Sequence, residues 1–238
     1  MRRPYFHQFV ITALMSLCWA VSVNASLTDK EEIEQALAAI GSGSAEEIKS
    51  RLFTYNITFV SAEFRAKAIN ELPAAIREQR LTQGKLLRRI EPVFQQVLQL
   101  HERSGKVELF LFHHDFPLAQ LWRGGVLMIS DGLAEVLYEG ELAGLFAHEL
   151  GHSYFEDEMA AAQRNQDTRA MRLTELKCDG VAIVSLKLLG HNPALYLKGL
   201  QRIQTITKQK SLSSSVVQSH PAMVTRAQFS ERLIKSLN

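Results

Sequence analysis

Apolar residues recur every three or four positions from Ser26 to about Gly105, which is the spacing of a buried helix face. The stretches "AKAINELPAAIREQRL" and "GKLLRRIEPVFQQVLQLHERSG" follow this period most clearly. Capping boxes, in which Glu follows an oxygen-bearing residue by three positions, indicate helix starts at Thr28–Glu31 and Ser44–Glu47. Because "GSGS" at Gly41–Ser44 interrupts the pattern between them, we expect several short helices here.

The hydrophobic period changes after this helical part. Lys106–Phe112 ("KVELFLF") and Gly124–Ser130 ("GGVLMIS") are short, apolar and bounded by turn residues, so they predict two strands of a small sheet. Helical spacing returns at Asp131 and continues, with interruptions, to the end of the chain. The expected fold class is therefore α+β and mainly helical.

The first 25 residues have the pattern of a secretory signal peptide. "MRR" is basic, "FVITALMSLCWAVSV" is apolar, and small residues at Val23 and Ala25 predict cleavage after Ala25. An uncleaved N-terminal anchor is the alternative, although the apolar run is shorter than the about 20 residues of a spanning helix. No later segment is apolar for long enough to cross a membrane, so we expect no transmembrane span in the mature chain.

Cleavage would change the charge and the cysteine content. Arg2 and Arg3 account for the whole formal charge of +2, so the mature chain is formally neutral. This balance gives no support for nucleic acid or anionic lipid as a partner. Cys18 also leaves, and Cys178 alone cannot form an intramolecular disulfide, so we expect it to be buried. A short signal without a disulfide suits a Gram-negative periplasm.

The strongest chemical signal is "HELGH". His148 and His152 lie one turn apart on the same face of a predicted helix, as two ligands of one zinc ion require. Glu149 lies about 100° around the helix, where it can reach a water without taking a coordination position. "TELKCDG" supplies Glu175 as a third ligand, with Asp179 one turn later to accept a ring N–H from a histidine. The alternative is that these two carboxylates are solvated helix charges.

These motifs resemble the gluzincin zinc metallopeptidases and, from Leu86 onwards, the HtpX-like and CAAX-prenyl-protease family. "GGVLMISDGLAEVL" is similar to that family's edge strand and following helix, and "HELGH" to its zinc helix. "ELKCDGVAIVSLKLLGHNP" is similar to its E-x-x-A-D helix, with Cys178 in place of Ala. "HPAMVTR" is similar to its C-terminal His-Pro followed by Arg, here His220 and Arg226.

The resemblance implies a role for each matching residue. His148, His152 and Glu175 would bind one Zn²⁺ per chain. Glu149 would be the general base, and Asp179 would orient a ligand from the second layer around the metal.

The resemblance also implies residues that surround the cleft. His220 and Arg226 would lie near the metal and either steady the oxyanion or order the helix that lines the cleft. For His220 the alternative is a helix-start residue before Pro221. An extended substrate would add to an edge strand that borders the cleft, through Val126, Leu127, Met128 and Ile129.

The resulting expectation is a zinc-dependent endopeptidase of the cell envelope that acts on unfolded or misassembled envelope proteins. It would be a soluble, exported member with a gluzincin-type core, because the hydrophobic spans of the family's membrane-embedded members are missing. Its partners would be polypeptide substrates and an envelope or outer-membrane protein, without nucleic acid. The expected divisions are 1–25 (signal peptide), 26–84 (helical accessory segment) and 85–238 (zinc metallopeptidase domain).

Two alternatives concern residues around this site. The alternative function is a metal-stabilised binding or chaperone-like envelope protein with an occluded or latent site. This would apply if the loop Lys208–Ser219 covered the cleft and brought His220 onto the metal. His113, His114 and Asp115 in "FHHDFP" are either extra ligands or a turn after a strand. The serines at Ser213–Ser215 have no activating base beside them in the sequence, so we reject a serine nucleophile.

Overall fold

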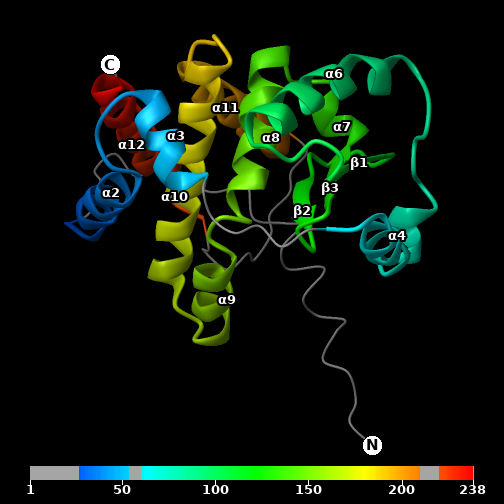
Figure 1. The fold of residues 1–238 in the computed structure, drawn as a ribbon, viewed down its shortest axis with the longest axis horizontal. Helices are drawn as coiled ribbons and strands as arrows, with labels where there is room; N and C mark the ends of the chain where they lie inside the picture. Colours follow the sequence, from blue (N-terminus) through cyan, green and yellow to red (C-terminus); the bar gives the residue numbers. More distant parts are fainter. Residues whose placement is uncertain (1–26, 54–59, 210–219, 238) are drawn as a thin grey trace, which may run out of the picture.

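The computed structural model describes residues 27–53, 60–209 and 220–237, which are mainly helical and contain a three-stranded sheet (Figure 1). The predicted α+β fold class is confirmed. The expected signal peptide and most of the Ser-rich loop lie outside these ranges. Within them, no helix combines the length and the apolar character needed to span a bilayer. The described elements are α2 (Leu27–Ile40), α3 (Ala45–Leu52), α4 (Ala62–Asn70), α5 (Ala74–Arg77), α6 (Lys85–Leu100), β1 (Glu108–Phe112), β2 (Ala119–Trp122), β3 (Val126–Ser130), α7 (Asp131–Ala134), α8 (Glu139–Gly151), α9 (Glu156–Arg164), α10 (Thr168–Leu188), α11 (Ala194–Gln209) and α12 (Met223–Ser236).

Helices α8 and α10 pack against each other at the centre of the molecule (Figure 1). Both are buried on all sides over long stretches, which is typical of helices that are apolar around their circumference. Gly151 permits their close approach, because a Cβ added there would lie 3.1 Å from the Cα of Cys178. The missing side chain at Gly151 therefore sets the helix spacing at the end that carries the candidate ligands. Cys178 is buried there, as predicted.

Helices α2 and α3 pack against α10 and share its apolar core. α3 begins with the predicted capping box, in which Ser44 Oγ accepts the Glu47 N–H (3.2 Å) and the Glu47 carboxylate accepts the Ser44 N–H (2.8 Å). The cap predicted at Thr28 is wrong, because α2 already begins at Leu27. A division of the chain at residue 84 stays a prediction, but α2 and α3 belong to the core that supports the site.

The sheet contains a strand, β2, that the apolar pattern did not predict. The strand order is β1-β3-β2, with β1 parallel and β2 antiparallel to β3. The turn between β2 and β3 has positive φ at Arg123 (48°) and Gly124 (69°), which is the type I′ geometry of tight hairpins. β3 is therefore the central strand, and the expectation that it forms the edge is wrong because both of its sides are already hydrogen-bonded.

Apolar side chains cover both faces of this sheet. Leu109, Leu127 and Ile129 join the main core with the helices. The other face packs against α4 and α5, and α4 lies on the side of the sheet away from α2 and α3 (Figure 1). The apolar cluster on that face contains Ala68, Leu72, Ile76, Phe110, Phe112, Leu118, Val126 and Met128. Burial on both faces explains why β3 reads as a continuous apolar run.

Candidate active site

Helix α8 presents two imidazoles at its C-terminal end. His148 lies in the last turn, and His152 directly follows the helix as its C-cap with helical φ and ψ. Their ring centroids are 5.1 Å apart and their planes are nearly perpendicular. The i,i+4 spacing therefore places both rings on one side of the helix, as the sequence predicts.

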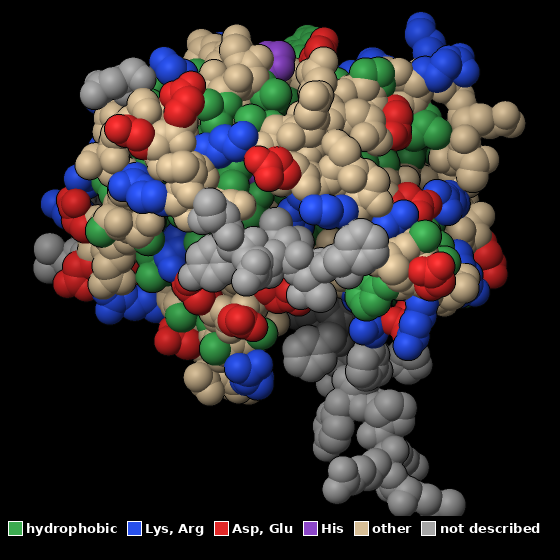
Figure 2. Space-filling model, in the orientation of Figure 1, with side chains coloured by type: hydrophobic (Ala, Val, Ile, Leu, Met, Phe, Trp, Pro, Cys, Tyr) green, Lys and Arg blue, Asp and Glu red, His purple; other side chains and the backbone are tan. Residues whose placement is uncertain are grey.

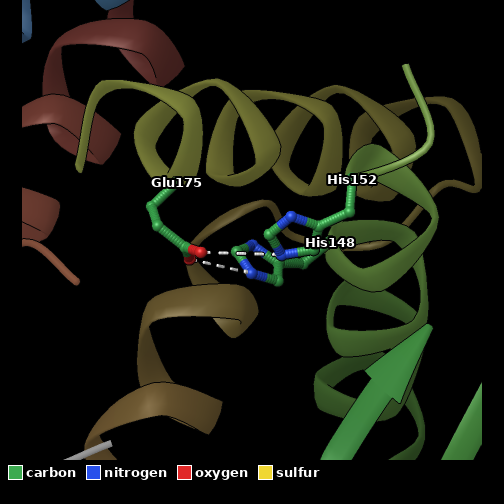
Figure 3. A group of neighbouring side chains, drawn as sticks. All are labelled: His148, His152 and Glu175. Carbon is green, nitrogen blue, oxygen red and sulfur yellow. Dashed lines mark ion pairs between the residues drawn. The ribbon is translucent and has the colours of Figure 1, made fainter. Parts of the chain in front are cut away.

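Glu175 on α10 points at both imidazoles (Figure 3). Its Oε2 lies 3.4 Å from His148 Nε2, and its Oε1 lies 3.7 Å from His152 Nε2. The candidate ligand atoms of the three residues all lie within 4.8 Å of one another. Zinc bonds of about 2.1 Å at tetrahedral angles would separate neighbouring ligand atoms by about 3.4 Å. The observed spacing is close to that of a zinc site.

One oxygen of Glu175 supports a cation at this position. Oε2 is buried and accepts no hydrogen bond from the described residues. Burial raises the pKa of Glu175, but the imidazoles of His220 and His152 outweigh burial and hold that pKa well below its usual range. A buried carboxylate oxygen without a donor is unfavourable, and a cation between Glu175 and the imidazoles would compensate it. Two imidazoles and one carboxylate are the donor set of many catalytic zinc sites, so these residues fit zinc.

A buried polar network contacts the Nδ1 side of the His148 ring. His148 Nδ1 lies 3.0 Å from Asp179 Oδ1 and 2.8 Å from the Tyr196 hydroxyl. Arg226 donates from Nε to Asp179 Oδ2 (2.8 Å) and from Nη2 to Oδ1 (2.5 Å), so the pair is bidentate. Burial raises the pKa of Asp179, but Arg226 and His148 outweigh it and lower that pKa. Asp179 is thus an ionised acceptor facing His148.

The same network changes the protonation of His148 before a metal binds. Burial lowers the pKa of His148, but the hydrogen bond to Asp179 and the negative charge of Glu175 outweigh burial and raise it to about 9. This shift favours the protonated imidazole in the metal-free protein. Zinc binding at Nε2 therefore has to displace a proton, which makes metal affinity weaker at low pH.

The Glu149 carboxylate contacts the edge of the sheet. Its Oε2 accepts the backbone N–H of Leu121 on β2 at 3.2 Å. This contact identifies β2 as the strand that borders the Glu149 carboxylate. Val126, Leu127, Met128 and Ile129, predicted to bind substrate, are buried in the central strand β3 and do not line the cavity. Strand addition there is excluded, and β2 takes the position that the sequence assigned to β3.

A cavity of about 360 Å³ lies in front of the ligands. Its polar lining includes His148, Glu149, His152, Glu175 and His220. Its apolar lining comes from β2, α8, α9, α10 and α11, and includes Leu121, Leu145, Met159, Met171, Leu200 and Ile203. The cavity therefore combines the polar groups of the site with an apolar part of its wall, as ligand-binding sites do.

Residues 80–178 match the model of peptidase family M48. This match supports a zinc metallopeptidase. M48 peptidases are zinc-dependent, and the matched segment contains all three candidate ligands and Glu149. No curated protein matches the chain. The HtpX-like or CAAX-prenyl-protease subtype stays a prediction.

Other predicted residues lie at or near this M48-like site. His220 Nε2 is 3.3 Å from Glu175 Oε2, so His220 reaches the same oxygen as His148. Burial lowers the pKa of His220, although Glu175 opposes this effect. His113 lies outside the cluster, where Nδ1 pairs with Asp131 Oδ2 at 2.7 Å. Asp131 Oδ1 also accepts the His114 N–H, which favours the turn interpretation of "FHHDFP".

Tyr196 is the residue of this network that sequence reasoning missed. It lies in α11 and its side chain is buried against His148. A single tyrosine in "PALYLKGL" has no motif partner nearby in the sequence. Its position on an apolar helix face was the only signal in the sequence. A tyrosine buried there needs a hydrogen-bond partner for its hydroxyl.

Proposed function

We propose that the chain is a zinc-dependent endopeptidase that hydrolyses peptide bonds in proteins of the cell envelope. The observation that carries the proposal is the convergence of His148, His152 and Glu175, with Glu149 beside them at the edge strand. The M48 match supports the same reaction class. One buried oxygen of Glu175 accepts no hydrogen bond from the described part of the chain, which supports a cation as part of the site.

The chemistry divides between the ion and the protein. A zinc ion held by the three ligands would polarise the scissile carbonyl and lower the pKa of a water molecule towards about 7. Glu149 accepts the proton of the attacking water and then delivers it to the leaving amine. Leu121 N–H holds the Glu149 carboxylate at the edge of β2 and keeps it oriented towards the cavity.

The substrate would bind as an extended peptide along β2. Among the described residues this strand pairs only with β3, and residues of β2 line the cavity. Backbone hydrogen bonds to an edge strand fix a peptide without regard to its sequence, which suits unfolded protein substrates. The apolar wall of the cavity would receive one substrate side chain.

The proposed location is the periplasm, reached through a signal peptide cleaved after Ala25. Substrates would be unfolded or misassembled envelope proteins, and an envelope or outer-membrane protein is proposed as a partner. Basic and acidic side chains are interspersed over the face drawn in Figure 2, so neither sign dominates that face. We therefore propose no nucleic-acid partner.

The decisive test combines metal analysis with casein cleavage by the purified mature protein, with and without chelator. Glu149→Gln should keep one zinc per chain and lose cleavage by about 10²–10⁴-fold, because it removes only proton transfer. His148→Ala and Glu175→Ala should instead lose the zinc. Loss of zinc from Glu149→Gln, or cleavage by the wild type that survives zinc removal, would contradict the proposal.

A second function is favoured by one observation. His220 lies at the Glu175 oxygen, where it could occupy the metal in place of water. The chain would then be a latent enzyme, or a metal-stabilised binding protein of the envelope, until a partner displaces this histidine. The loop proposed to hold His220 there is Lys208–Ser219, and its residues 210–219 are outside the described ranges.

A further inference from the structure

The Tyr196 hydroxyl lies where four helices meet. It contacts His148 of α8 at Nδ1 (2.8 Å), Asp179 of α10 at Oδ1 (2.6 Å) and Arg226 of α12 at Nη2 (2.7 Å). The tyrosine itself belongs to α11 and is 2% exposed. Its hydroxyl therefore links a candidate zinc ligand to the buried ion pair behind it.

The protons in this network can be assigned from its chemistry. A tyrosine hydroxyl has one proton to donate and two lone pairs that accept. The ionised Asp179 can only accept, so the Tyr196 proton points to Oδ1. Arg226 can only donate, so it uses one lone pair of the hydroxyl. The remaining lone pair faces His148, which requires His148 Nδ1 to carry a proton.

A proton on Nδ1 decides which nitrogen can bind a metal. Nε2 of His148 faces Glu175 and the cavity, whereas Nδ1 faces the network. We propose that Tyr196 is a positioning residue, whose hydroxyl fixes the ring of His148 and its Nδ1–H so that Nε2 is presented to the zinc ion. This inference rests on the proposed function, because it takes His148 as a zinc ligand.

Gly144 of α8 leaves room for the ring of Tyr196. A Cβ added at Gly144 would lie 3.1 Å from Cδ2 of Tyr196, so a larger residue on α8 would displace the ring. The ring also stacks against His148 with centroids 5.8 Å apart, and the Arg226 guanidinium lies 5.9 Å from its centroid. Phenylalanine would keep these ring contacts, so Tyr196→Phe isolates the hydroxyl.

The Tyr196 hydroxyl and Asp179 both contact the Nδ1 atom of His148, so the hydroxyl adds a second hydrogen-bond acceptor there. Asp179 Oδ1 lies 3.0 Å from His148 Nδ1 and also receives Arg226 Nη2. Without the tyrosine hydroxyl, the Nδ1–H would depend on this shared and longer contact. Loss of a hydrogen-bond partner of a zinc-bound histidine typically lowers metal affinity about 10–100-fold. We expect a loss in that range for Tyr196→Phe.

The chain contains a matched control. Tyr154 is also buried, and its hydroxyl lies 2.8 Å from Nδ1 of another histidine, His101, outside the ligand cluster. Zinc dissociation constants of the full mature chain should be measured by competition with a chromophoric chelator. Tyr154→Phe should bind zinc like the wild type, and casein cleavage by zinc-saturated samples should be recorded for all three proteins.

A second measurement does not depend on any variant. In the zinc-loaded wild type labelled with ¹⁵N-histidine, the ring spectrum should show a proton on His148 Nδ1 that exchanges slowly with water. An unprotonated Nδ1, or equal zinc affinities of Tyr196→Phe and Tyr154→Phe, would overturn the inference while leaving the enzyme intact. Failure of the wild type to bind zinc would overturn both the inference and the proposed function.

Discussion

His220 and His148 approach the same atom of the site. Their Nε2 atoms lie 3.3 Å and 3.4 Å from Oε2 of Glu175. A ring in that position can do one of two things once a metal is bound. It can donate a hydrogen bond to the oxyanion of the reacting substrate, or it can occupy the corner that water needs.

His220→Ala distinguishes these roles. For the proposed enzyme we expect the variant to retain zinc and to lose about 10²–10³-fold in casein cleavage, as expected for an oxyanion donor. His113→Ala is the control, because His113 is exposed and pairs with Asp131 away from the cavity. Faster cleavage by His220→Ala than by the wild type would instead establish the latent form.

Local spacing was enough to predict some of the site and not the rest. His148, Glu149 and His152 are placed by the geometry of a single helix, so their mutual arrangement follows from the sequence. Glu175 required only that a second apolar helix pack against the first. The role of Tyr196 could not be predicted, because its hydroxyl gains its contacts only where α8, α10, α11 and α12 meet.

At the scale of elements, the missed strand β2 has a physical explanation. It is four residues long and all its residues are only half-buried, so it lacks the apolar run that marks β1 and β3. Its pairing depends on the hairpin turn, where Arg123 takes a positive φ that arginine seldom adopts. The sequence predicted that Val126–Ile129 forms the edge strand beside the cleft, and this was wrong because the unrecognised β2 occupies that edge.

The spacing of α8 and α10 is the element-level feature that the ligand geometry requires. Gly151→Ala would place a methyl group 3.1 Å from the Cα of Cys178, which is backbone and cannot rotate away. We expect the helices to separate, with weaker zinc binding and a loss of about 1–3 kcal/mol in stability. Zinc titration and thermal unfolding of the variant measure both effects.

Gly199→Ala provides a control for this substitution. Gly199 lies in α11, and its added Cβ would lie 3.2 Å from the Cβ of Glu141, which belongs to the first turn of α8, away from the candidate ligands. This contact is nearly as tight as the one at Gly151, so the control should lose a similar amount of stability but bind zinc like the wild type. Equal zinc affinity of the two variants would show that the close approach at Gly151 is not needed for the site.

At the scale of the whole molecule, the match to the peptidase family covers only residues 80–178. The core extends further in both directions along the chain. Ile33, Ile40 and Ile48 of α2 and α3 belong to the same apolar cluster as α8 and α10, and Arg226 of α12 holds Asp179. Helices α8 and α10 are therefore supported by segments outside the matched region, so folding of the candidate site should depend on those segments.

Ile40→Ala tests that dependence. The Ile40 side chain lies against Gly180 of α10, beside Asp179, and is 1% exposed. Its truncation should lower the free energy of unfolding by about 2–5 kcal/mol, because it leaves a cavity against α10. Phe64→Ala, at a position 43% exposed, should change stability by less than about 0.5 kcal/mol. If the N-terminal helices and the site form one cooperative unit, circular dichroism and zinc release will report the same lowered transition for Ile40→Ala. A separate early transition that leaves the temperature of zinc release unchanged would show instead that α2 and α3 unfold independently of the metal centre.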